Sequence, residues 1–432
     1  MKEHSIRFLQ SFIVLCFFTL TAVAQPLPAG TPFSLGISPE RLERINTHMR
    51  GAVDSGIMVG GEAVIARRGK VAYRQTWGMS DREAGDPATT DTLYRIYSMT
   101  KPVTAVAMML LYEEGRFQLN DPLARHLPEF ADLKVLEGSG EDGDPVLRDP
   151  ARAPTIRDLM RHTAGMTYGV FGNTAVDSAY RETGLLQSPD LETFTRRLAT
   201  LPLQYDPGER WHYSVAVDLQ GRLVEVLSGM AFADFLRERI FEPLGMEDTA
   251  FVLSPEQRPR LAQLYSPEGT QISWNDPWQL SQSQALEVAD PRLSEAFIDG
   301  GYFASGGAGL VSSTSDYLRF SQMLLNGGEF DGVRLLSPRT VEHMRRNHLS
   351  GIGRESLTSA GGFGLGVAVT VDPGVGGEIG SAGSYGWGGA AGTRFWVDPE
   401  EDLIAIFMTQ SVPHQTQLGD QFRTLVYQAL ID

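Results

Sequence analysis

The chain has 432 residues, enough for two or three domains with large buried cores. Hydrophobic residues make up 42% and charged residues 21%, which argues against intrinsic disorder, collagen-like repeats and a polytopic membrane protein. With 53 acidic against 37 basic side chains the formal net charge is −16, so the chain repels nucleic-acid phosphates and we expect no nucleic-acid partner.

The first 24 residues read as an export signal that is removed from the mature protein. Lys2 and Arg7 precede an apolar run over residues 12–20, and small residues stand at positions 22–24. Because the run is only nine residues long, it is too short to span a bilayer, so an uncleaved anchor fits less well. A lipoprotein signal cleaved before Cys16 also fits less well, since a large residue precedes that cysteine. We therefore expect an exported protein, periplasmic or extracellular, with no stable membrane insertion after cleavage.

Cysteine and lysine are both rare, and this limits the available chemistry. Cys16 is the only cysteine, so a mature chain from residue 25 has no disulfide, no thiolate metal site and no cysteine nucleophile. Arginine outnumbers lysine by 33 to 4, and the lysines beyond the signal are Lys70, Lys101 and Lys134. Arginine readily replaces a surface lysine but not one that must lose its proton, because guanidinium stays charged. These three lysines are therefore candidates for a chemical role.

The predicted elements begin with a helix from Ser38-Pro39 to Gly56, which has an apolar stripe at helical spacing. Strand-like runs over residues 62–67 and 71–77 follow as a hairpin. Apolar periodicity then predicts helices over residues 103–114, 155–162, 191–200, 215–228, 232–240, 316–326 and 339–347. The chain closes with expected strands over residues 364–371, 393–397 and 403–409 and a helix over residues 418–430.

This order predicts an α/β fold of the α+β type, in which both termini build one antiparallel sheet flanked by helices. We expect residues 25–120 and 300–432 to form a discontinuous α/β domain and residues 121–299 to form an inserted, mostly helical lobe. Residues 137–154 are rich in Gly, Asp and Pro and read as an exposed loop. Residues 254–299 form a second irregular region, in a position to overhang a pocket.

Ser98-Met99-Thr100-Lys101 is the first segment with chemical potential. Pro102 fits the first turn of the next helix, so Ser98 should lie at the N-terminus of that helix. Lys101 then lies one turn later on the same face, with its amine within reach of the Ser98 hydroxyl. The unpaired N–H groups and the positive dipole end favour an oxyanion beside Ser98. An N-cap serine beside a surface lysine would give the same pattern.

Two further segments contribute polar groups or open backbone. Pro207-Gly208 forms a turn before Trp211-His212-Tyr213-Ser214, and Ser214 can cap the following helix, which places Tyr213 at a helix entrance. A phenol there can serve as a base, although a tyrosine in this position is more often a packing residue. The glycine-rich segment 380–393 lies beside a strand, where its backbone either approaches a ligand closely or forms a hairpin turn.

Together these segments resemble the serine β-lactamase-like hydrolases, in the branch with class C β-lactamases, DD-peptidases, D-amino acid amidases and family VIII carboxylesterases. Their order matches from about residue 38 onward: Ser98-Met99-Thr100-Lys101 is similar to the S-x-x-K box, Tyr213-Ser214-Val215 to the tyrosine box, and Trp387-Gly388-Gly389 to the third box. Residues 161–166 and 306–313 resemble other family segments, which we interpret as scaffold. The resemblance implies the β-lactamase/DD-peptidase fold, with no metal and no cofactor.

The third box departs from the β-lactamase pattern in a way that favours an esterase. β-Lactamases and peptidases carry K-T-G there, whereas this chain has Trp387-Gly388-Gly389 and no lysine beyond Lys134. The tyrosine box also lacks the asparagine of β-lactamases. Both changes resemble the family VIII esterases. We therefore expect Trp387, Gly388 and Gly389 to contact a small-molecule ester with a short to medium acyl group.

The resemblance also implies a mechanism of acyl transfer. Ser98 attacks the ester carbonyl and forms an acyl-enzyme, while Lys101 and Tyr213 move the serine proton to the leaving alcohol. The oxyanion would lie between the backbone N–H groups of Ser98 and Ala390. Free lysine and tyrosine both titrate near pH 10, so the group that accepts the proton must be activated by its surroundings. The sequence leaves both side chains open as the base.

Other functions fit the sequence less well. No G-x-S-x-G elbow and no H-E-x-x-H pair occurs, which argues against an ordinary α/β-hydrolase and against a zinc site of that kind. A β-lactamase, D-aminopeptidase or DD-peptidase stays open as an alternative. A non-catalytic envelope binding protein on the same fold is a second alternative, but such a protein is expected to have lost its nucleophile or base. The oligomeric state is also open.

Overall fold

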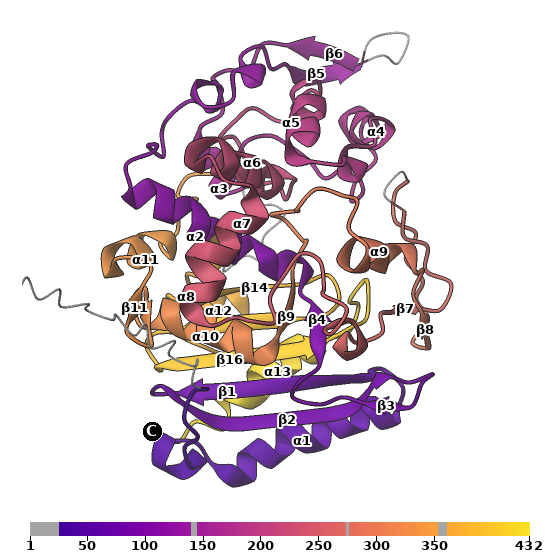
Figure 1. Ribbon diagram of the computed structural model, residues 1–432, viewed down its shortest axis with the longest axis vertical. Coiled ribbons are helices and arrows are strands. Elements are labelled where there is room, and N and C mark those ends of the chain that lie inside the picture. Colours follow the sequence, from indigo (N-terminus) through magenta and orange to yellow (C-terminus); the bar gives the residue numbers. More distant parts are fainter. Residues whose placement is uncertain (1–25, 140–144, 274–275, 353–360) are drawn as a thin grey trace, which may run out of the picture.

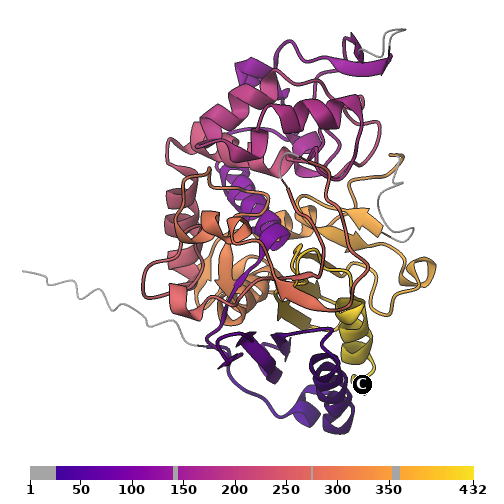
Figure 2. The same cartoon turned by 90° about the vertical axis from the view of Figure 1, so that its right-hand side faces the viewer.

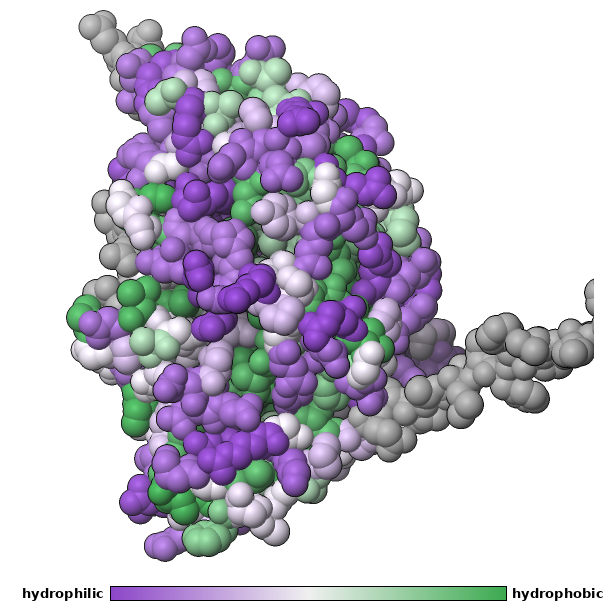
Figure 3. Space-filling model, turned by 90° about the vertical axis from the view of Figure 1, so that its left-hand side faces the viewer, coloured by the Kyte–Doolittle hydropathy of each residue, from purple (hydrophilic) through white to green (hydrophobic). Residues whose placement is uncertain are grey.

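The computed structural model describes residues 26–139, 145–273, 276–352 and 361–432. The predicted export signal therefore lies outside the described residues. No helix in these ranges is both long enough and apolar enough to cross a membrane. The face of the molecule in Figure 3 is mostly hydrophilic, with smaller hydrophobic areas between the polar ones.

An eight-stranded antiparallel sheet joins the two ends of the chain, as the sequence predicts. At its centre β1 pairs with β16, and Gly61 lies opposite Thr409. Figure 1 shows these two strands side by side, β1 in indigo and β16 in yellow. In spatial order the strands are β12 (Gly361–Phe363), β13 (Ala368–Thr370), β14 (Tyr385–Gly388), β15 (Arg394–Asp398), β16 (Leu403–Thr409), β1 (Gly60–Arg67), β2 (Lys70–Asp81) and β3 (Asp86–Pro87).

β16 is a central strand, paired with β15 on one side and β1 on the other, and both of its faces are buried. Its sequence, LIAIFMT, is a continuous apolar run. Alternate residues point to opposite faces, so Ile404 and Ile406 enter the larger hydrophobic core while Leu403 and Ala405 enter the smaller one. Helices cover both faces: α1 (Pro39–Asp54) and α13 (Leu418–Tyr427) pack on the smaller core, and α10 (Thr314–Leu325) packs on the larger.

α2 (Thr100–Glu113) is the central helix of the molecule. Every residue from Thr100 to Leu111 is buried, which explains why the sequence of α2 is apolar all round. Helices α3 to α6 gather at the end of the molecule away from the sheet, in the upper part of Figures 1 and 2. The other α-helices of the described residues are α3 (Ile156–Met160), α4 (Ala175–Glu182), α5 (Leu191–Ala199), α6 (Ala216–Ser228), α7 (Phe232–Leu236), α8 (Glu242–Leu244), α9 (Arg292–Ile298), α11 (Pro338–Met344) and α12 (Pro373–Gly376).

The sequence prediction is wrong for two segments of the fold. The expected loop over residues 137–154 contains most of an antiparallel hairpin, formed by β5 (Val135–Ser139) and β6 (Pro145–Arg148). The expected strand over residues 364–371 is a strand only at β13, because residues 364–367 form the turn between β12 and β13. Gly366 permits this turn with a backbone φ of 84°, and its backbone packs against Ala105 of α2.

Three more two-stranded ribbons complete the described elements. They pair β4 (Leu93–Arg95) with β9 (Val311–Ser313), β7 (Tyr265–Pro267) with β8 (Leu286–Val288), and β10 (Glu329–Phe330) with β11 (Val333–Arg334). The ribbon β4–β9 leads the chain directly into α2 and so fixes where that helix begins. The domain boundaries at residues 120 and 300 stay predictions.

Candidate active site

Ser98 lies where β4 turns into α2, as the sequence predicts. It is the middle residue of a short 3₁₀ turn, Tyr97–Met99, immediately before the helix. The preceding Tyr97 has a φ of 41°, a left-handed backbone conformation that a bulky residue rarely adopts. Ser98 itself is partly exposed, whereas both of its neighbours are buried. This turn therefore presents the serine hydroxyl at the surface of a densely packed segment.

Lys101 lies one helical turn after Ser98, and its amine contacts three oxygen atoms. Nζ lies 3.1 Å from Ser98 Oγ, 2.9 Å from the Tyr168 hydroxyl and 2.7 Å from the Gly307 carbonyl oxygen. The side chain is fully buried. Because an ammonium carries three protons, these three acceptors match its full donor capacity.

Tyr213 reaches the same serine from the other side. Its hydroxyl lies 2.6 Å from Ser98 Oγ, and Lys101 Nζ lies 4.5 Å from the centre of its ring. Tyr213 precedes α6 as predicted, but Val215 and not Ser214 is the N-cap residue of that helix. The structure thus brings Ser98, Lys101 and Tyr213 into mutual contact.

Aromatic rings hold Tyr213 in place. Trp211 stacks on it with ring centres 5.9 Å apart, and Tyr168, His162 and Trp387 contact it at 5.2, 5.0 and 5.7 Å. Burial and the nearby charge of Lys101 hold the pKa of His162 well below its ordinary value. A neutral histidine is therefore part of this packing at neutral pH.

Sequence reasoning missed two residues next to Lys101. One is Tyr168, whose hydroxyl binds the lysine amine, and whose pKa is raised well above its ordinary value by burial and by Tyr213 and Asp218. The other is Asp218, a buried carboxylate that accepts hydrogen bonds from Ser305 Oγ at 2.5 Å and from the Gly307 N–H at 3.0 Å. Burial raises the pKa of Asp218, and the charge of Lys101 opposes this rise.

Segment 306–313, which the sequence predicts to be scaffold, also contacts the site. Asp218 holds the N–H of Gly307, and the carbonyl oxygen of the same residue binds Lys101. A methyl group on Gly307 would lie 2.7 Å from Asp218 and 2.9 Å from the Tyr168 hydroxyl, so only glycine fits there. A single aspartate in a predicted helix, such as Asp218, gives no signal of this role in the sequence, and neither does a single tyrosine in a loop, such as Tyr168.

A cavity of about 720 Å³ opens beside Ser98. All of the residues predicted to contact substrate line it: Trp387, Gly388, Gly389 and Ala390. One wall is aromatic, formed by Phe171, Trp211, Tyr213, Trp278 and Trp387. Trp278 comes from the irregular region 254–299, which was expected to overhang a pocket.

Two backbone N–H groups beside the cavity are available to an oxyanion. Those of Ser98 and Ala390 donate to no acceptor within the described ranges. Ala390 follows β14, and its carbonyl oxygen accepts the N–H of His414, which fixes this peptide. Gly389 allows the close approach of β14 to Ser98, since a methyl group there would lie 2.4 Å from the carbonyl oxygen of Ile96.

Charged residues that are paired with one another also line the cavity. Arg394 forms an ion pair with Asp420. Arg423 donates to the carbonyl oxygen of Ile379 at 3.0 Å and to Ser384 Oγ at 3.2 Å, and its guanidinium lies 3.8 Å from Glu378. Among the described residues, no group of three or more His, Cys, Asp or Glu side chains is arranged to hold a metal ion.

Comparisons with known proteins agree with this geometry. The model of the Beta-lactamase family matches residues 45–428. Protein Rv1367c from Mycobacterium tuberculosis is 36% identical over 84% of this chain and 89% of that protein. Esterase EstB from Burkholderia gladioli is 32% identical over 82% of this chain and 86% of that protein. The solved structure of EstCE1, a hydrolase with promiscuous acyltransferase activity, matches with a TM-score of 0.71 at 27% identity, over 90% of this chain and 98% of that chain.

Proposed function

This chain belongs to the Beta-lactamase family, and from that premise we propose that it is an exported esterase that forms an acyl-enzyme on Ser98. Its similarity to Esterase EstB and to EstCE1 makes it a serine hydrolase that acts on esters. One observation carries the assignment to Ser98: the Tyr213 hydroxyl and the Lys101 amine both contact Ser98 Oγ at the edge of the cavity.

In the proposed mechanism Ser98 Oγ attacks the ester carbonyl carbon and Tyr213 accepts its proton. The contacts of Lys101 support this division of roles. An ammonium that donates to Ser98, Tyr168 and Gly307 has no lone pair left to accept a proton. Lys101 then acts as a hydrogen-bond donor that holds Ser98 Oγ beside the Tyr213 hydroxyl.

The carbonyl oxygen becomes negatively charged as the serine attacks. The backbone N–H groups of Ser98 and Ala390 would stabilise it, since neither donates to an acceptor in the part of the chain that the structure describes. Tyr213 returns the proton to the leaving alcohol, which leaves the acyl group on Ser98. A water molecule then attacks the acyl carbon and Tyr213 accepts its proton. Tyr213 passes this proton to Ser98 Oγ as the bond between the acyl carbon and Ser98 Oγ breaks, and the acid is released.

The proposed substrate is a neutral carboxylic ester with a short to medium acyl group. The aromatic wall offers apolar contact to the acyl or alcohol part. Both arginines that line the cavity, Arg394 and Arg423, already have carboxylate partners, which disfavours the carboxylate of a β-lactam or of a D-alanyl peptide. The contacts made to Ser98 disfavour a non-catalytic binding protein.

A fluorophosphonate probe tests the nucleophile directly. It should label Ser98, as identified by peptide mapping, and Ser98→Ala should lower kcat for p-nitrophenyl butyrate by several orders of magnitude while the protein stays folded. Rapid quenching during turnover of the same ester should give a protein heavier by one butyryl group. Labelling of a different serine would overturn the assignment.

Export rests on the sequence of the first 24 residues alone. Expression of the full chain in a bacterium followed by fractionation should place the protein in the periplasm or medium. N-terminal sequencing should then begin at Gln25. A cytoplasmic protein that retains Met1 would refute this part of the proposal.

Acyl transfer to an alcohol is a second candidate function. The description of EstCE1 as a hydrolase with promiscuous acyltransferase activity favours it, together with an aromatic wall that can bind an apolar alcohol in place of water. Adding butanol to the esterase assay should then give butyl ester as a second product. Hydrolysis without any butyl ester would restrict the enzyme to water as acceptor.

A further inference from the structure

One guanidinium that lines the cavity, that of Arg394, is paired with a neighbouring carboxylate. Arg394 begins β15, and its side chain packs against the first turn of α13, where Gly419 and Asp420 lie. Asp420 forms the ion pair with Arg394, and both residues line the same cavity as Ser98. The side chain of Asp420 is 64% exposed to solvent. Water can therefore hydrate its carboxylate, and Asp420 does not need the ion pair to offset burial.

The cavity beside Ser98 is also lined by residues of β14 and by Arg394. Gly388 of β14 lies directly opposite Arg394 of β15, whereas Trp387 lies opposite Phe395. Because side chains alternate along a strand, Trp387 and Arg394 belong to opposite faces of the sheet. Gly388 has no side chain to fill the face that it shares with Arg394, and the cavity extends along both residues.

We propose that Asp420 is a specificity-determining residue, which keeps Arg394 from binding a carboxylate on the substrate. The inference rests on the proposed esterase function and adds to it the residue that excludes anionic esters. An incoming carboxylate would have to displace Asp420 from the guanidinium and would lie near that negative charge. A neutral substrate group does not compete with Asp420 for the Arg394 guanidinium.

The second arginine provides a matched comparison. Arg423 is buried, stacks on Trp396 and Tyr427, and donates to the carbonyl oxygen of Ile379 and to Ser384 Oγ. Its carboxylate neighbour, Glu378, is farther away, at 3.8 Å. Removing the charge of Glu378 should therefore make fewer N–H groups of Arg423 available to a ligand than removing the charge of Asp420 makes available on Arg394.

The test compares anionic and neutral esters on Asp420→Asn. The esters are p-nitrophenyl butyrate, the mono-p-nitrophenyl ester of glutaric acid, and 3-carboxyphenyl butyrate, so that the negative charge lies on the acyl side or on the alcohol side. The variant should raise the kcat/KM ratio of at least one anionic ester to the neutral ester by about tenfold or more. Adding Arg394→Gln should remove the gain, and Glu378→Gln alone should change the ratio by less than about threefold.

The inference is overturned if neither anionic ester gains, or if the gain persists in the double variant. A binding measurement separates this outcome from failure of the esterase proposal. Calorimetric titration with glutarate should show about tenfold tighter binding to Asp420→Asn than to the parent protein, whether or not either one cleaves esters. Asp420→Ser should behave like Asp420→Asn if the asparagine variant folds poorly.

Discussion

Two tyrosines contact the Lys101 amine, Tyr168 through its hydroxyl and Tyr213 through its ring, and of these two only Tyr213 has a hydrogen bond to Ser98 Oγ. Tyr168 binds the lysine and shares an aromatic contact with Tyr213, 5.2 Å between ring centres. Both tyrosines therefore contact Lys101 and each other, but only Tyr213 contacts the reacting serine. This makes them a matched pair for separating proton transfer from positioning.

We expect Tyr213→Phe to lower kcat by about 10²- to 10⁴-fold, because it removes the group that takes the serine proton. Tyr168→Phe should cost at most about tenfold in kcat, since Lys101 keeps its contacts with Ser98 and Gly307. Steady-state kinetics with p-nitrophenyl butyrate, with melting temperatures as the folding control, checks both. Equal losses in the two variants would contradict the assignment of Tyr213 as the base.

At the residue scale, local spacing made part of the site predictable. The three-residue interval from Ser98 to Lys101 corresponds to one helical turn. In the structure Lys101 Nζ lies 3.1 Å from Ser98 Oγ. Tyr168 and Asp218 were not predicted, because their proximity to Lys101 depends on how separate segments pack together. The ion pair between Arg394 and Asp420 could not be predicted for the same reason, because β15 and α13 come into contact only in the folded protein.

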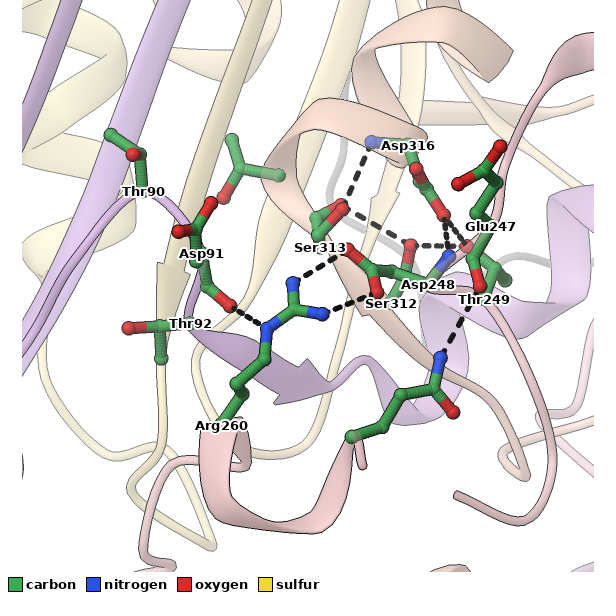
Figure 4. Close-up of polar contacts among 12 residues, drawn as sticks. Thr90, Asp91, Thr92, Glu247, Asp248, Thr249, Arg260, Ser312, Ser313 and Asp316 are labelled. Atoms are coloured by element: carbon green, nitrogen blue, oxygen red, sulfur yellow. Dashed lines mark hydrogen bonds and ion pairs between the residues drawn. The ribbon is translucent and has the colours of Figure 1, made fainter. Parts of the chain in front are cut away.

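At the scale of elements, the N-terminus of α10 is connected to the chain before β7 by a partly buried polar cluster (Figure 4). Asp316 accepts hydrogen bonds from the N–H of Asp248 at 2.8 Å and from Thr249 Oγ1 at 2.9 Å. Arg260 forms two hydrogen bonds with Asp248 and one with the carbonyl oxygen of Asp91. Burial raises the pKa of Asp316 to about 7.

This carboxyl should make stability depend on pH. Asp316 is protonated more readily in the folded protein than in the unfolded chain, where its pKa is near 3.8. Its contribution to stability is therefore complete below pH 4 and is lost as the pH rises to about 7, a change on the order of 4 kcal/mol. Asp316→Asn cannot ionise, so the free energy of unfolding of the variant should fall less than that of the parent over this range.

Urea unfolding of both proteins between pH 4 and pH 8 measures the difference. Asn keeps an oxygen that can accept from Asp248 and Thr249, so the variant should remain folded. A difference between the two proteins that is constant across this pH range would show that Asp316 does not titrate there.

The turn between β12 and β13 gives a second prediction for an element. Gly366 has a φ of 84°, and a methyl group there would lie 2.3 Å from the Ala105 Cβ of α2. Gly377 has a similar φ of 67° with no atom within 4 Å. Gly377→Ala should therefore cost about 1–2 kcal/mol from backbone strain, and Gly366→Ala about 1–3 kcal/mol more from the clash.

Urea denaturation of the two glycine variants provides the check. Equal losses would mean that the packing of the turn against α2 adds nothing to its backbone strain. The turn at Gly366 also explains why the predicted strand over residues 364–371 is formed only in part. The apolar alternation over residues 364–371 resembles one strand, and the turn is imposed by a glycine packed against a helix distant in sequence.

At the scale of the whole molecule, the strands at the two ends were predictable because their apolar runs are long. β16 matches the expected strand over residues 403–409 in full. β14 was harder to see, since it has only four residues and two of them are glycine. Its place in the sheet comes from pairing with β15, which the local pattern does not contain.

The charge pairing throughout the cavity leads to a prediction for substrate choice. In one buffer, kcat/KM should be highest for p-nitrophenyl butyrate and lower by about ten- to a hundredfold for nitrocefin and for a D-alanyl peptide. Both of the latter bring a carboxylate to a cavity whose two arginines, Arg394 and Arg423, are already paired. Faster turnover of nitrocefin or of the peptide would identify the protein as a β-lactamase or a peptidase.

The pairing of β1 with β16 also has a consequence for the synthesis of the protein. Thr409 binds the carbonyl oxygen of Gly60, 349 positions earlier in the chain. As the chain leaves the ribosome, hairpin β1–β2 is complete long before its partner strand exists, so the apolar edge of β1 stays open. During that interval the nascent chain is prone to aggregate, and a chaperone that shields this edge should raise the yield of folded protein.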